Sequence, residues 1–132
     1  MFKAGLLKGV LCVAAAAAMA AQTAQAVENE DLNFDTTEDL YQVCAVKPDQ
    51  PEYVAASFAC RGFIEAAVQY HDQVTDRRNL KRLICYPQGA SIADGRTAFV
   101  AWARANAGDA KLMGEAPVVG LVRALAAKYP CQ

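Results

Sequence analysis

The sequence predicts a small all-α domain, a bundle of about four helices stapled by two disulfides. Three observations predict this class. No segment alternates apolar and polar residues with the period of two that a half-buried strand requires. Apolar residues recur instead at intervals of three and four over several long segments. Four cysteines follow an export-type leader, which favours disulfide bonds over free thiols.

The leader is residues 1–26. Lys3 and Lys8 make its start positive, small apolar residues follow from 10 to 21, and Ala24-Gln25-Ala26 forms a small-x-small cleavage site. The apolar run is too short and too rich in alanine to be a good membrane span. We therefore expect a secretory signal peptide that is cut after Ala26.

The chain that remains after removal of the leader has the size of a single domain. Removing 26 of the 132 residues leaves 106, enough for one domain and too few for two. Thirteen basic residues, less Lys3 and Lys8, against fourteen acids give it a net charge of −3, which does not indicate nucleic-acid binding. Because acids crowd its start, residues 27–35 are predicted to be an acidic flexible arm and residues 36–132 one helical domain.

The first helix of that domain is predicted to start at Thr36 or Thr37. Thr36-Thr37-Glu38-Asp39 resembles a capping box, and the acids suit the positive end of the helix dipole. A short apolar stripe of Leu40, Val43 and Cys44 follows. The segment 47–51, which contains two prolines, then ends the helix.

A long amphipathic helix is predicted from Pro51 to about Val74, with Asp49 supplying its start. Val54 and Phe58 fall on its charged side, so either the N-terminal arm or another protein could cover them. Because single exposed apolar residues are common, plain exposure is the favoured interpretation. The face predicted to be buried consists of Tyr53, Ala56, Cys60, Phe63, Ile64, Ala67, Tyr70 and Val74.

A basic connector is predicted over residues 75–86, where Arg77, Arg78, Lys81 and Arg82 cluster. Such a cluster is more often solvated than bound; if it does bind, we expect an acidic protein surface or an anionic lipid. The residues Pro87-Gln88-Gly89 that follow predict a turn.

Two further helices complete the predicted bundle. Ser91-Ile92-Ala93-Asp94 resembles a second capping box, and its helix is predicted to run to about Asn106. The last helix is predicted from Pro117, or a turn earlier, to Tyr129, and Pro130 stops it.

The cysteines beyond the leader are Cys44, Cys60, Cys85 and Cys131. Four cysteines allow three pairings, and their number alone does not choose among these. Cys44 ends one predicted helix and Cys60 lies within the next, which favours pairing Cys44 with Cys60 and Cys85 with Cys131.

Residues suited to catalysis are few. His71 is the only histidine, and exported cysteines in even number are more often oxidised than nucleophilic. No two cysteines have zinc-site spacing, and there is no phosphate-binding glycine loop or nucleophile elbow. We therefore expect no enzyme, no catalytic residue, no metal and no cofactor. His71 is expected at the edge of the core with one ring nitrogen bonded.

The local contexts of the four cysteines resemble a known family. They are DLYQVC at 39–44, CRGFI at 60–64, ICYPQG at 84–89, and AL at 124–125 with YPC at 129–131. Together with the signal peptide, this order is similar to the Rap/Tai family of type VI secretion immunity proteins. The resemblance covers nearly all of the exported chain.

The resemblance implies a periplasmic all-α protein that binds and neutralises a secreted effector, typically a peptidoglycan amidase, by occluding its active site. Such an inhibitor is often a homodimer. The family has no catalytic residues, and the four cysteines carry over as structural sites. Relatives often have a His-Pro turn where this chain has Ala107-Gly108-Asp109, which leaves the identity of the effector open.

We expect the effector-facing surface at helix ends, on the turn 86–91 and the connector 107–113. The candidate contacts are Tyr86, Gln88, Asp109, Lys111 and Met113.

Two functions other than immunity stay open. One is an acid-stress periplasmic chaperone of the HdeA type, which would bind clients at about pH 2 to 3. The other is an orphan envelope protein that keeps the fold without a toxin partner.

Overall fold

The computed structural model describes residues 33–132, and over that range it contains five helices and no strand. The helices are α1 (Thr37–Cys44), α2 (Tyr53–Arg78), α3 (Ile92–Asn106), α4 (Ala110–Met113) and α5 (Pro117–Lys128). The predicted all-α class is therefore confirmed. The predicted leader and most of the predicted acidic arm lie outside the described residues.

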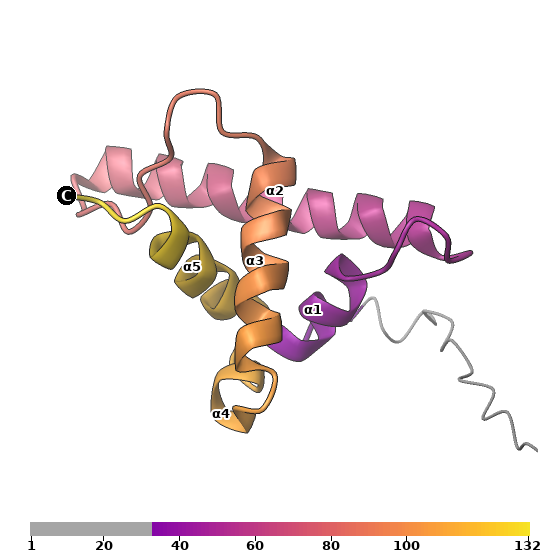
Figure 1. Ribbon diagram of the computed structural model, residues 1–132. Helices are drawn as coiled ribbons and strands as arrows, with labels where there is room; N and C mark the ends of the chain where they lie inside the picture. The colour runs from indigo at the N-terminus through magenta and orange to yellow at the C-terminus, as the bar shows by residue number, and fades with distance from the viewer. Residues whose placement is uncertain (1–32) are drawn as a thin grey trace, which may run out of the picture.

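The long helix α2 is the element on which the other helices are assembled (Figure 1). α3 crosses α2 near its middle, and α1 and α5 lie on either side of α3. α2 packs against α1 and α3, and α5 packs against the same two helices. Each of these four helices contributes fully buried apolar residues to the core: Leu40, Val43, Cys60, Ile64, Phe99, Ala103, Leu121 and Leu125.

Both predicted capping boxes are confirmed. Thr36 Oγ1 accepts the Asp39 amide at 3.2 Å, and the Asp39 carboxylate accepts the Thr36 amide at 2.8 Å. Ser91 and Asp94 repeat this pair of bonds at the start of α3. Hydrogen bonds from Ser91 lower the pKa of the Asp94 carboxyl, which favours the ionised form that this cap requires.

The predicted start of α2 is wrong. The helix begins at Tyr53 after Glu52, and no side chain accepts its first amides. Asp49 instead lies in a turn that Gln50 closes, because the Gln50 side chain accepts the Lys47 amide at 2.8 Å. The expected cap by Asp49 is therefore not formed, and the first amides of α2 have no side-chain acceptor.

The predicted end of α2 is one turn too early. The helix continues through Arg77 and Arg78, whose charges suit the negative end of its dipole, so these residues are helical. Asn79 ends it in the left-handed conformation, with a φ of 49°. Tyr70, predicted to be buried, is 72% exposed because it lies at the margin of the apolar arc.

Two disulfides join the helices in the pairing that the sequence favoured. Cys44 at the end of α1 is bonded to Cys60 in α2, and Cys85 is bonded to Cys131 beyond α5. An unpredicted contact supports the first bridge: the Arg96 guanidinium of α3 donates to the Cys44 carbonyl at 2.8 Å and to the Val46 carbonyl at 3.0 Å. Arg96 thereby satisfies carbonyls that the end of α1 leaves free.

Candidate partner-binding groove

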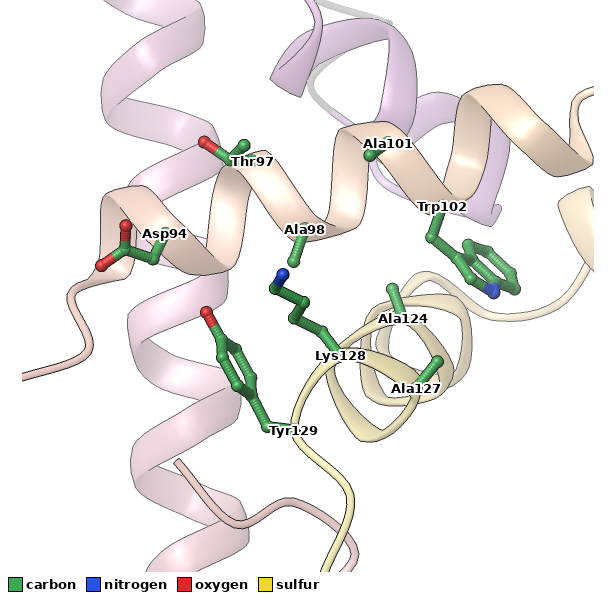
Figure 2. A pocket seen from close by; sticks show the side chains of 9 residues that line it. All are labelled: Asp94, Thr97, Ala98, Ala101, Trp102, Ala124, Ala127, Lys128 and Tyr129. Atoms are coloured by element: carbon green, nitrogen blue, oxygen red, sulfur yellow. The ribbon is translucent and has the colours of Figure 1, made fainter. Parts of the chain in front are cut away.

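An open groove with a volume of about 450 Å³ lies between α3 and α5. Figure 2 shows the side chains that line it. They come from both helices and from the residue after α5: Asp94, Thr97, Ala98, Ala101, Trp102, Ala124, Ala127, Lys128 and Tyr129.

Alanines form the floor of this groove. Ala98 and Ala101 are three residues apart on α3, and Ala124 and Ala127 are three residues apart on α5. Residues three apart share one face of a helix, and an alanine side chain ends at Cβ, so the space between the two helices is not filled. The floor is therefore apolar, and its shape is fixed by helical backbone.

The two ends of the groove differ in chemistry. Trp102 lies at one end, and Asp94, Lys128 and Tyr129 lie at the other (Figure 2). The Lys128 side chain reaches from α5 toward Ala98, and within the described residues its ammonium group makes no ion pair. Tryptophan and tyrosine offer large apolar contact areas with a polar end and are enriched in protein interfaces. This combination suits a segment of polypeptide.

The described residues favour a metal site less than they favour a site for a polypeptide segment. Over residues 33–132, no group of three or more His, Cys, Asp or Glu side chains is placed to hold a metal ion. All four cysteines in this range form disulfides, so none offers a thiolate.

The two loops predicted to face the effector lie at opposite ends of α3. The turn 86–91 precedes α3 and the connector 107–113 follows it, so a helix of 15 residues separates them. At 1.5 Å per residue this is roughly 20 Å. The loops do not form one continuous patch, but the groove runs along α3 between them.

The predicted contacts on these loops differ in accessibility. Gln88, Asp109 and Lys111 are exposed. Asp109 also has a structural role, because its carboxylate accepts the Lys111 amide at 3.0 Å and the Leu112 amide at 3.1 Å at the start of α4. Met113 is a correction: only 4% of it is exposed, because the unpredicted helix α4 turns its side chain into the core.

Tyr86 is half-buried and does not itself line the groove. Its ring packs on Tyr129 with 5.7 Å between the ring centroids. The Tyr86 hydroxyl is buried and has no hydrogen-bond partner among the described residues. Burial, reinforced by the negative charge of Asp72, raises the pKa of Tyr86 to about 12.

Replacing Tyr86 with phenylalanine is expected to raise the free energy of unfolding by about 1 kcal/mol, because an unpaired buried hydroxyl is removed while the ring stays. Chemical denaturation of both proteins at neutral pH measures this. A destabilised variant would instead show that the hydroxyl has a buried water as partner. Tyr129→Phe, which alters the half-buried neighbour, is the matched control.

A comparison with known proteins identifies the family of this chain. The sequence model for Rap1a immunity proteins matches residues 36–131. The chain belongs to the Rap1a immunity proteins. The predicted resemblance is thereby confirmed, and the matched range contains every described helix and all four bonded cysteines. No curated protein and no solved structure matches the chain.

Membership in the Rap1a family implies a protein that binds a cognate effector. In the described part of this Rap1a protein, no helix has both the length and the apolar character needed to cross a membrane.

One residue of the predicted basic connector pairs with acidic residues of the same chain. Arg82 pairs with Asp76 at 2.8 Å and lies 3.7 Å from Asp72. Lys81 is exposed.

His71 has a structural role in this Rap1a protein. Its side chain is 8% exposed, and both ring nitrogens are engaged, where one was predicted. Nε2 accepts the Leu83 amide at 3.3 Å, so the ring proton lies on Nδ1 and is donated to the Asp72 carboxylate at 2.9 Å. These bonds hold the connector against α2.

The sequence alone does not predict the groove. The signal that could have indicated it is the pair of alanines three apart on each of two neighbouring helices. Only the contact between α3 and α5 turns these two separate patterns into one surface.

Proposed function

We propose that this protein is a periplasmic immunity protein that binds an effector delivered by a type VI secretion system and occludes its active site. The proposed effector is a peptidoglycan amidase, the class that the Rap/Tai resemblance implies. The proposal rests on the family match over residues 36–131, which spans every described helix. The inhibitor is proposed to act without catalysis and as a homodimer.

The proposed route to the periplasm is a signal peptide of residues 1–26 that is cut after Ala26. The exported chain would then carry an acidic arm at 27–35 and the helical domain at 36–132. Two disulfides in a domain of this size support an oxidising compartment, because thiols in the bacterial cytosol are kept reduced.

The proposed effector-binding surface is the groove between α3 and α5, together with the exposed residues Gln88, Asp109 and Lys111 in the loops at the two ends of α3. An inhibitor loses little entropy on binding when its surface is already ordered. Here the floor lies on two helices, and the Cys85–Cys131 disulfide joins the segment that follows α5 to the segment before α3. A projecting segment of the effector would enter the groove and place the loops over the rim of its active site.

Capture of the effector tests this proposal. The oxidised chain of residues 27–132 is immobilised and exposed to the secreted proteins of its own strain, and bound proteins are identified by mass spectrometry. We expect one peptidoglycan hydrolase retained at stoichiometric level. If nothing specific binds at neutral pH while many unrelated envelope proteins bind at about pH 3, the acid-chaperone function replaces the immunity proposal.

Replacing Ala101 with arginine is expected to weaken effector binding about a hundredfold, because a long charged side chain would fill the apolar floor at the centre of the surface. Ala101 is exposed, so the unfolding transition should stay unchanged. Ala55→Arg is the matched control, since Ala55 is exposed on α2, outside the groove. Equal binding by both variants would remove the groove from the interface.

A further inference from the structure

The end of α2 and the connector that follows it form a surface that is both basic and apolar. Leu80 is 54% exposed and Leu83 is 56% exposed, and the two lie three residues apart. Arg77 and Arg78, the last residues of α2, and Lys81 are exposed as well. We call these five residues the basic tip. Figure 1 shows this end of α2 at one edge of the molecule, beside the C-terminus.

The positive charge of the basic tip is not neutralised within the described part of the chain. Arg82 is the residue that pairs with the nearby acids, Asp76 at 2.8 Å and Asp72 at 3.7 Å. The three cations of the basic tip make no ion pair with any residue of the described range. Over residues 71–85, four basic side chains against two acidic ones give a local charge of +2. This end is therefore positive although the exported chain as a whole is negative.

Backbone hydrogen bonds fix the shape of the connector at both leucines. The Leu80 amide donates to the Thr75 carbonyl at 3.0 Å, and the Leu83 amide donates to His71 Nε2 at 3.3 Å. The next residue, Ile84, is the one that enters the core, where it is 1% exposed. Folding of this chain therefore leaves about half of each leucine in water, on an ordered segment.

We infer that the basic tip binds the surface of an anionic phospholipid bilayer, with its leucines among the acyl chains and its cations at the lipid phosphates. A leucine side chain gains free energy on leaving water, and a lysine or arginine near an anionic bilayer is attracted to it. Segments that lie in a membrane surface combine the same two kinds of side chain. The inference does not rest on the proposed function, because the basic tip shares no residue with the groove between α3 and α5.

The small size of the basic tip favours a bilayer over an acidic protein. A specific protein interface uses about 20 to 30 residues on each side, and the basic tip has far fewer. A bilayer requires no such area, because each apolar side chain enters it separately and each cation meets a phosphate of its own. The position of the basic tip at one edge of the molecule lets a flat surface reach it (Figure 1).

Flotation of the oxidised chain of residues 27–132 with lipid vesicles tests the inference. One set of vesicles contains equal amounts of phosphatidylglycerol and phosphatidylcholine, and the other contains phosphatidylcholine alone. We expect reversible binding to the anionic vesicles that is weaker than that of a single acyl anchor, with half of the protein bound at lipid concentrations on the order of millimolar. Binding to the neutral vesicles should be at least tenfold weaker, and about 0.5 M salt should release the protein.

Replacing both leucines tests the apolar part of the contact. Leu80→Ser combined with Leu83→Ser should weaken binding to the anionic vesicles at least fivefold, because the serines gain nothing from the acyl region. Val118→Ser combined with Val119→Ser is the matched control, at residues of α5 that are 44% and 38% exposed, and should leave binding unchanged.

Replacing the three cations of the basic tip with glutamine tests the electrostatic part. Binding should weaken at least tenfold, since each cation near an anionic bilayer contributes roughly fivefold. The matched control removes the same charge at exposed residues elsewhere, with Lys47→Gln, Arg61→Gln and Arg104→Gln, and should bind within about twofold of the original.

Three results would overturn the inference: no binding to the anionic vesicles, equal losses in a variant of the basic tip and its control, or a loss with the cations but none with the leucines. Soluble polyglutamate bound as strongly as the vesicles, with the same indifference to the leucines, would assign the basic tip to an acidic protein surface instead.

Discussion

Replacing Cys44 and Cys60 together with alanine is expected to lower the free energy of unfolding by about 4 kcal/mol. The bridge closes a separation of 16 residues, for which chain entropy predicts about 3 kcal/mol. Both residues are fully buried, so the loss of two packed sulfur atoms should add about 1 kcal/mol. A small domain has only about 5 to 15 kcal/mol of total stability, so this loss is severe.

Denaturant unfolding of the oxidised proteins, followed by far-ultraviolet circular dichroism, measures the difference. Reduction of the unmodified protein is the control, and because it opens both bridges it should destabilise more than the double variant does. A double variant within about 1 kcal/mol of the original would show that packing alone holds α1 on α2.

Replacing Gly120 with alanine should destabilise the protein by about 2 kcal/mol although alanine is the better helix former. A Cβ at this buried position would lie 2.8 Å from the Thr37 Cβ and would clash with the Thr37 Cγ2 and Oγ1. Thr37 cannot turn away, because it is β-branched and its amide and hydroxyl donate to the Glu115 carbonyl. Overpacking and strained hydrogen bonds therefore outweigh the propensity gain of about 1 kcal/mol.

Gly62→Ala is the matched control for this prediction. Gly62 also lies inside a helix, but nothing surrounds its missing Cβ, so alanine there should stabilise the monomer by about 0.5 to 1 kcal/mol. Thermal or denaturant unfolding of the two variants at a concentration that keeps them monomeric should move in opposite directions. A Gly120→Ala protein as stable as the original would mean that α1 and α5 separate easily.

Local features of the fold could be predicted from the sequence. The capping boxes at Thr36 and Ser91 were found because their bonds join residues three apart, and the end of α3 at Asn106 follows from Gly108 and Asp109 nearby. The sequence predicts too early an end for α2, because buried Thr75 and left-handed Asn79 carry no apolar signal.

Features that depend on long-range contacts could not be predicted. Arg96 bonds carbonyls that lie 50 and 52 residues earlier, and no sequence pattern indicates such a pair. The sequence does not predict the burial of Met113, because a helix of four residues is too short to show periodicity. The groove needs the pairing of α3 with α5, which only the assembled bundle supplies.

Competition between sibling cells tests the immunity proposal most directly. A strain that lacks this gene is mixed, in cell contact, with its parent, and survival is followed with the parental secretion system active and inactive. We predict that the deletion strain is lysed only when that system is active. Restoring the whole chain should protect it, and restoring residues 27–132 without the leader should not. Equal survival of the deletion strain beside an active parent would contradict the proposal.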